Sequence, residues 1–80
     1  MTKDEIYARI QKILVEQKGE DFLISPDLSL NDEIAEDSVE VMEFVISLED
    51  EFGMDISDHD IENLITLSDI VSYIQNKNVR

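Results

Sequence analysis

The feature that most constrains the fold of this 80-residue chain is a helix-start signal that occurs four times. At each one, a Thr, Asp or Ser stands three positions before an acidic residue, which is the spacing of a capping box at a helix N-terminus. The four pairs are Thr2 with Glu5, Asp37 with Glu40, Ser57 with Asp60, and Thr66 with Asp69. No alternating apolar and polar stretch is long enough to favour a sheet. The sequence therefore predicts an all-α fold.

Apolar residues at helical spacing follow the first, second and fourth signals. The predicted helices cover residues 3–17, 38–52, a short segment over 57–64, and a last segment from 66 onward. Gly19 and Gly53 supply stops for the first two helices. We therefore expect one domain over residues 1–80, a small four-helix bundle with a short third helix and a long loop between the first two.

The long loop from Gly19 to Asp37 has no sustained period, and its Ser25-Pro26-Asp27 sequence is typical of a turn. It nevertheless keeps five apolar residues that would pin it to the core, namely Phe22, Ile24, Leu28, Leu30 and Ile34. A loop of this length is uncommon in a compact domain. The length indicates either a functional loop or an additional short helix, and the sequence leaves both interpretations open.

Composition excludes several classes of protein. The chain contains no cysteine, so disulfide scaffolds, thiolate zinc sites and cysteine nucleophiles are all absent. There is no apolar run of about 18 residues and no basic segment followed by an apolar one at the start, which disfavours a membrane span and a signal peptide. We expect a cytoplasmic protein whose fold depends on its apolar core.

Charge is the strongest compositional signal, because 20 acidic residues oppose 6 basic ones and give a net charge of −14. No Lys or Arg occurs from Gly19 to Asn76, a stretch that holds 17 of the acidic residues. Such a surface disfavours binding to nucleic acid, opposes self-association and should gain stability with salt. We expect a monomer that attracts basic partners, although an acidic surface can also serve solubility alone.

The helix predicted over 38–52 carries two apolar stripes. The stripe with the spacing of a buried helix face contains Val41, Phe44, Val45, Leu48 and Phe52. A second stripe, roughly 130° around the helix, contains Val39, Met42 and Ile46, with Glu43 and Asp50 on one side and Glu49 on the other. A small bundle cannot easily bury both. We expect the second stripe to stay partly exposed as a docking surface, unless the long loop folds over it.

Ser38 falls in the first turn of this helix, where unpaired backbone amides and the helix dipole favour an attached or bound anion. A phosphodiester on its Oγ would be well placed there. The position alone also fits a second capping residue beside Asp37.

The sequence around Ser38 adds a resemblance. Glu36-Asp37-Ser38-Val39-Glu40-Val41-Met42-Glu43 resembles the Asp-Ser-Leu attachment motif and acidic helix of acyl carrier proteins, with Val39 in place of Leu. Leu48-Glu49-Asp50-Glu51-Phe52-Gly53, Ile56-Ser57-Asp58 and Asp69-Ile70-Val71-Ser72-Tyr73-Ile74 resemble later parts of the family in the right order. Ala35-Glu36 stands where many members have glycine. The fatty-acid type fits better than a peptidyl carrier, and a D-alanine carrier remains an alternative.

The resemblance implies a carrier that catalyses nothing itself. A carrier-protein synthase, which is a phosphopantetheinyl transferase, would attach 4′-phosphopantetheine from coenzyme A to Ser38, using Mg²⁺ held mainly by the synthase. Asp37 would fix the serine geometry and help to orient the metal. The arm would carry acyl thioesters between acyltransferases and other enzymes of fatty acid or related lipid biosynthesis. Their basic patches would dock on Val39, Glu40, Met42, Glu43, Ile46, Glu49 and Asp50.

A calcium loop is a weaker interpretation. Four acidic residues, Asp58, Asp60, Glu62 and Asp69, fall at positions 1, 3, 5 and 12 of a possible EF-hand. Asn63, however, stands where that loop needs glycine, and Asp69 is shorter than the usual bidentate Glu. We therefore predict no specific metal site.

A catalytic site is also not indicated. His59 is the sole histidine, has no nucleophile beside it in sequence and is predicted to be a surface residue. Tyr7 and Tyr73 lie on amphipathic segments and are predicted to be packing residues. The main alternative to a carrier is an acidic helical adaptor that binds a basic protein through the 38–52 helix without being modified.

Overall fold

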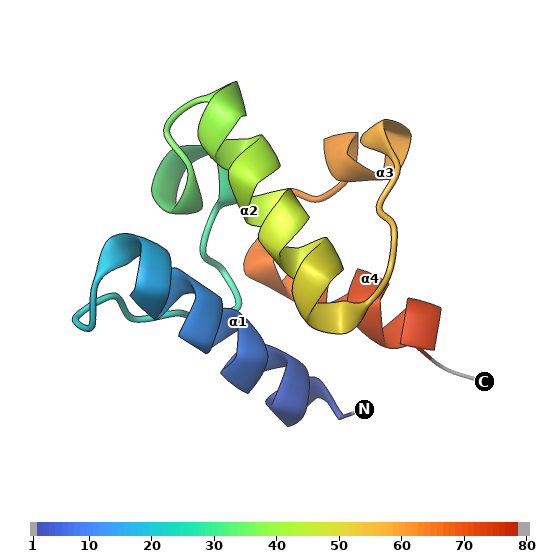
Figure 1. Cartoon of the computed structure of the whole chain (residues 1–80), viewed down its shortest axis with the longest axis horizontal. Helices are drawn as coiled ribbons and strands as arrows, with labels where there is room; N and C mark the ends of the chain where they lie inside the picture. The colour runs from blue at the N-terminus through green and yellow to red at the C-terminus, as the bar shows by residue number, and fades with distance from the viewer. Residues whose placement is uncertain (1, 79–80) are drawn as a thin grey trace.

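The computed structural model describes residues 2–78 and contains helical segments without strands among them (Figure 1). The segments are α1 (Lys3–Lys18), the single π-helical turn η1 (Leu30–Ile34), α2 (Ser38–Phe52), α3 (Asp58–Glu62) and α4 (Leu67–Asn78). The prediction of an all-α fold is confirmed. η1 adds a fifth helical segment to the four that were predicted.

The four capping residues act where the sequence places them. The hydroxyl or carboxylate of Thr2, Asp37, Ser57 and Thr66 accepts the backbone N–H three residues later, at 2.9–3.3 Å. Only at Thr66 does the acidic partner, Asp69, also accept the N–H of the capping residue, at 3.1 Å. The end of α2 is set by Gly53, whose φ of 62° lies in the left-handed region that favours glycine. Local sequence therefore determines where α1, α2, α3 and α4 begin.

The loop between α1 and α2 resolves the alternative left open above, because part of it is an additional short helix. In η1 the N–H groups of Ile34 and Ala35 donate to carbonyl groups five residues earlier, those of Ser29 and Leu30. Its start is fixed from a distance: Leu30 N–H donates to the Ile65 carbonyl and Leu67 N–H donates to the Leu28 carbonyl, both at 2.9 Å. The prediction that the loop is pinned to the core is confirmed.

The buried core draws on all the long helices, on η1 and on both connections beside α3. It contains Ile6, Ile10, Ile13, Leu14, Leu28, Leu30, Ile34, Phe44, Val45, Leu48, Phe52, Ile56, Leu64, Leu67, Ile70, Val71 and Ile74. The buried face of α2 is the predicted one, with Val41 half-buried at its edge. α3 contributes no fully buried residue, and it ends two residues earlier than predicted because Leu64 turns into the core.

Polar contacts fasten α1 to α2 outside this core. Gln17 Nε2 donates to Ser47 Oγ at 2.8 Å, and Arg9 and Lys18 pair with Glu51 and Glu40, each at 3.5 Å. Among residues 2–78, no helix has both the length and the apolar character needed to cross a membrane.

Candidate functional site

The first turn of α2 separates the roles of Asp37 and Ser38. Asp37 is the capping residue, since its Oδ1 accepts the N–H of Glu40 at 2.9 Å. Ser38 is the first helical residue and is exposed, and no residue between 2 and 78 forms a hydrogen bond with its hydroxyl. The interpretation of Ser38 as a capping residue is therefore wrong, and its Oγ is available for chemistry.

The backbone that leads into Ser38 is held from both sides. Glu40 Oε2 accepts the N–H of Glu36 at 2.8 Å and pairs with Lys18 Nζ at 3.5 Å. Upstream, Ala35 is buried and its N–H donates to the carbonyl of Leu30, the first residue of η1. Because Ala35 and Glu36 are tied in this way, the turn presents Ser38 in one defined position.

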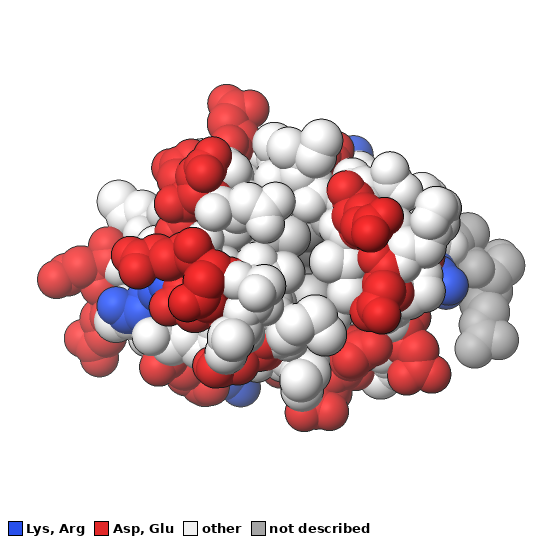
Figure 2. Space-filling view, turned by 90° about the horizontal axis from the view of Figure 1, so that it is seen from above, with Lys and Arg blue, Asp and Glu red and all other residues white. Residues whose placement is uncertain are grey.

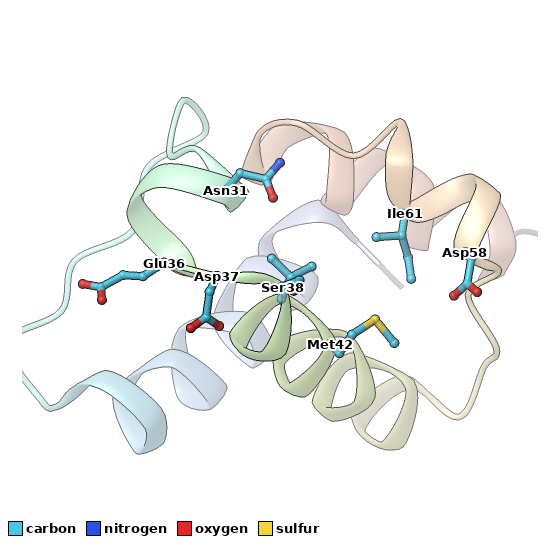
Figure 3. Close-up of a pocket in the computed structure, with 8 residues that line it drawn as sticks. Asn31, Glu36, Asp37, Ser38, Met42, Asp58 and Ile61 are labelled. Carbon is cyan, nitrogen blue, oxygen red and sulfur yellow. The ribbon is translucent and has the colours of Figure 1, made fainter.

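A hollow of about 460 Å³ lies beside Ser38 between α2, α3 and η1 (Figure 3). It is lined by Asn31, Glu36, Asp37, Ser38, Val41, Met42, Asp58 and Ile61. Figure 3 shows Met42 and Ile61 extending from α2 and α3 towards the space between these helices, while the Glu36 carboxylate points away from it. The hollow thus has a polar rim near Ser38 and an apolar side formed by Val41, Met42 and Ile61.

The second stripe of α2 is exposed, as expected. The exposed fractions of Val39, Met42 and Ile46 are 63%, 43% and 51%, because the α1–α2 loop follows the start of α4 instead of folding over them. Seen from above, the surface shows a band without charge between groups of Asp and Glu side chains (Figure 2). An apolar strip between acidic margins has the composition of a transient docking surface.

The four acidic residues predicted for this surface fall into two groups. Glu43 and Asp50 are exposed, and their carboxylates form no hydrogen bond or ion pair within residues 2–78. Glu40 is engaged as described, and Glu49 Oε2 accepts the N–H of Ile56 at 2.8 Å, which closes the turn after α2. Local sequence patterns do not indicate the pairing with Lys18, which is 22 positions from Glu40, or the bond from Ile56, which lies beyond the end of α2.

A polar contact that sequence reasoning missed joins α3 to α4. The Tyr73 hydroxyl donates to Asp60 Oδ2 at 2.6 Å. Burial, together with this bond to Asp60, raises the pKa of Tyr73 to about 12. The bond from Tyr73, aided by Ser57, lowers the pKa of Asp60 from its ordinary 3.8. Tyr73 packs against the core as predicted, but it also fastens the helix that bounds the hollow.

The acidic residues of the possible EF-hand do not assemble. Asp60 bonds to Tyr73, and Asp69 Oδ2 accepts the N–H groups of Ile65 and Thr66. In the part of the chain that the structure describes, no group of three or more His, Asp or Glu side chains is placed to hold a metal ion. His59 lies exposed on α3.

Comparison with known proteins identifies the family. A family model described as a phosphopantetheine attachment site matches residues 5–74. The acyl carrier protein of an Exiguobacterium species is 42% identical over 78 residues, covering 96% of this chain and 99% of that protein. That of Exiguobacterium sibiricum is 45% identical over 76 residues, covering 94% and 96%.

The free serine hydroxyl, the hollow beside it and the acidic helix agree with this match. A serine at a helix N-terminus with an open space beside it fits a covalently attached phosphodiester arm. The chain thus belongs to the acyl carrier protein family, whose members bear 4′-phosphopantetheine, serve synthase and biosynthetic enzymes, and act as carriers, not as enzymes.

Proposed function

We propose that residues 1–80 form a single carrier domain, that Ser38 is its attachment point for 4′-phosphopantetheine, and that the arm carries acyl groups as thioesters in fatty acid biosynthesis. The observation that carries the proposal is that the Ser38 hydroxyl has no hydrogen-bond partner within residues 2–78. It is exposed, unbonded within residues 2–78 and located at the first turn of α2, because Asp37 performs the capping role that a serine there would otherwise take.

The attachment step needs little from this chain beyond position. Ser38 Oγ forms a bond to the phosphorus that bears the pantetheine group of coenzyme A, its proton is lost to a base on the synthase, and adenosine bisphosphate leaves. Asp37 has its Oδ1 committed to the cap, while its Oδ2 forms no hydrogen bond or ion pair with any residue between 2 and 78. That oxygen is free to contact Mg²⁺ held by the synthase. The backbone amides of the first turn stabilise the resulting phosphodiester.

The hollow between α2 and α3 supports a further part of this proposal. Val41, Met42 and Ile61 give it an apolar side that begins next to Ser38. An acyl chain on a flexible arm would lose exposed apolar surface by entering it, at about 0.8 kcal/mol per buried methylene group. We propose that the carried chain shelters there between enzymes.

Partners would meet the exposed stripe of α2. Val39, Met42 and Ile46 supply apolar contact, and the acidic residues beside them attract the basic patches of the synthase, of acyltransferases and of fatty acid enzymes. Exposed ion pairs contribute roughly 0–1 kcal/mol each, so docking should be fast, weak and sensitive to salt. Rapid exchange between enzymes is what a shuttle requires.

Intact mass spectrometry tests the attachment. The protein is incubated with coenzyme A, Mg²⁺ and a phosphopantetheinyl transferase of broad specificity. We expect a gain of one phosphopantetheine group, its absence in Ser38→Ala, and its retention in Ser68→Ala, which removes another exposed serine hydroxyl near the start of a helix. A gain in Ser38→Ala would place the arm elsewhere, and no gain on folded wild-type protein would favour the unmodified adaptor.

The cargo needs a separate measurement. The loaded protein is offered long-chain fatty acids and D-alanine, each with the corresponding activating enzyme, and the mass gained on the arm is recorded. Loading with fatty acid alone supports the lipid pathway. Loading with D-alanine alone would replace the fatty acid part of the proposal and leave the carrier role intact.

A further inference from the structure

The two margins of the exposed α2 stripe are not equivalent. Glu49 stands on the α3 side and is bonded to the chain that leads into α3. Towards α1 lie Asp50 and Glu43, with Glu40 farther round the helix. On this side a basic residue of the same chain pairs with a carboxylate of α2, since Lys18 at the end of α1 lies 3.5 Å from Glu40.

A second hollow of about 260 Å³ lies between the end of α1, η1 and the start of α2, and the Lys18 side chain forms part of its wall. Glu40 and Glu43 both line this hollow, together with Gln17, Lys18 and Ile34. The Lys18 side chain is 26% exposed and that of Glu40 is 39% exposed. A basic side chain of a docking enzyme that approached these two carboxylates would therefore meet an ammonium group already in place.

We infer that Lys18 is a specificity-determining residue of the docking surface: it competes with the basic side chains of partners for Glu40. Partners then reach Glu43 and Asp50 first and use Glu40 only by displacing Lys18. The competition lowers affinity for basic partners in general and favours those whose positive groups match the spacing of Glu43 and Asp50. This inference rests on the proposed docking role of α2.

The fold does not depend on the Lys18 pair alone. Gln17 bonds to Ser47 at 2.8 Å, and Arg9 pairs with Glu51 at 3.5 Å, so α1 stays fastened to α2 without Lys18. Lys12 provides a matched control, because it is exposed on the same helix and has no ion pair within residues 2–78. Lys18→Gln and Lys12→Gln change the net charge equally, which separates displacement of a local pair from the long-range field.

The first measurement is the KM of the phosphopantetheinyl transferase for each variant at low salt. We expect Lys18→Gln to lower KM about two- to fivefold with kcat unchanged, and Lys12→Gln to lower it less than about twofold. Lys18→Arg keeps the pair and should behave like wild type. The advantage of Lys18→Gln should disappear at about 1 M salt, where surface charges are screened. Equal effects of Lys18→Gln and Lys12→Gln would overturn the inference.

A double-mutant cycle with Glu40→Gln gives a readout that a purely structural Lys18 would not change. The glutamine keeps an acceptor for the Glu36 N–H but removes the charge. With Lys18 present, Glu40→Gln should raise KM by less than about twofold, because partners make little use of an occupied carboxylate. With Lys18→Gln, the same change should raise KM about two- to fivefold. An equal rise in KM on Glu40→Gln, with Lys18 present and with Lys18→Gln, would contradict the competition.

The same variants are titrated in parallel with a synthetic amphipathic helix that has a leucine face flanked by arginines. This binding needs no modification of Ser38, so it keeps the two proposals apart. Absence of a mass gain in wild type, with Lys18→Gln still binding the peptide more tightly than Lys12→Gln, rejects the carrier proposal and retains the competition. A normal mass gain, with Lys18→Gln and Lys12→Gln binding the peptide equally well, retains the carrier proposal and rejects the competition.

Discussion

The two sides of α2 are built differently. Towards α1 and α4, α2 packs Phe44, Val45 and Leu48 into a continuous apolar core, and side-chain bonds add to this contact. Towards α3 it faces a five-residue helix with no fully buried residue, held to α4 through Tyr73 and Asp60. The first side fixes the position of Ser38. The second borders the hollow, and its short helix buries no residue of its own fully, so it should open more easily than the packed side.

The largest loss of unfolding free energy should follow from removing a side chain of α2 that is buried in the core. Phe44→Ala should cost about 3–5 kcal/mol of unfolding free energy, because the ring is fully buried and its removal leaves a cavity. Urea unfolding followed by circular dichroism measures this. Val39→Ala, on the exposed face of the same helix, should stay within about 0.5 kcal/mol. Similar losses for the two variants would mean that α2 is not held by its core face.

A smaller, local effect should follow from Tyr73→Phe, which removes the hydroxyl bonded to Asp60 and keeps the ring. We expect faster amide hydrogen exchange in α3 with little change in α1. Tyr7→Phe is the control, because the Tyr7 hydroxyl has no hydrogen-bond partner within the described residues. If exchange accelerates equally in α1 and α3, the bond contributes to the whole fold and does not specifically hold α3.

The same contact predicts a pH dependence. The pKa of Tyr73 rises from 10.0 to about 12, so the bond favours the folded state fully below pH 10.0 and is lost as pH rises through about 12. In Tyr7→Phe protein, the phenolate absorbance should report Tyr73 alone and titrate near 12. Asp60→Asn should lower that midpoint, since it removes the carboxylate that disfavours the phenolate. An unchanged midpoint would assign the shift to burial alone.

The smallest loss of unfolding free energy should follow from removing the exposed ion pair between α1 and α2. Arg9 contacts Glu51 at 3.5 Å and lies 5.8 Å from the centre of the Phe52 ring. Arg9→Gln should cost no more than about 1 kcal/mol in urea unfolding, and less as salt increases. A loss comparable to that of Phe44→Ala would show that polar contacts, and not the core, hold α1 to α2.

Sequence reasoning succeeded where the determinants are local. The starts of α1, α2, α3 and α4 depend on contacts three residues apart, and the buried and exposed faces of α2 follow from helical spacing. The resemblance to the family, which the match over residues 5–74 confirms, depended on contiguous strings of residues. These features could therefore be predicted from the chain alone.

The features that sequence reasoning missed depend on pairs distant in the chain. η1 is held by the bond from Leu30 to the Ile65 carbonyl. The helix α3, which forms one wall of the hollow, is fastened to α4 by the bond between Tyr73 and Asp60. The four acidic residues of α2 divide into bonded and unbonded ones because Lys18 of α1 pairs with Glu40 and Ile56 bonds to Glu49. No local pattern specifies such pairs, so only the assembled fold shows them.

The backbone bonds between residues 26–30 and 65–68 have a consequence for biosynthesis. They hold η1, and η1 holds the turn before Ser38, so the surroundings of Ser38 depend on a segment that follows it by more than 25 residues. While that segment is still being synthesised, the serine has been made but its surroundings have not formed. Under the proposed function, transfer of phosphopantetheine to Ser38 would therefore have to wait until residues 65–68 are in place.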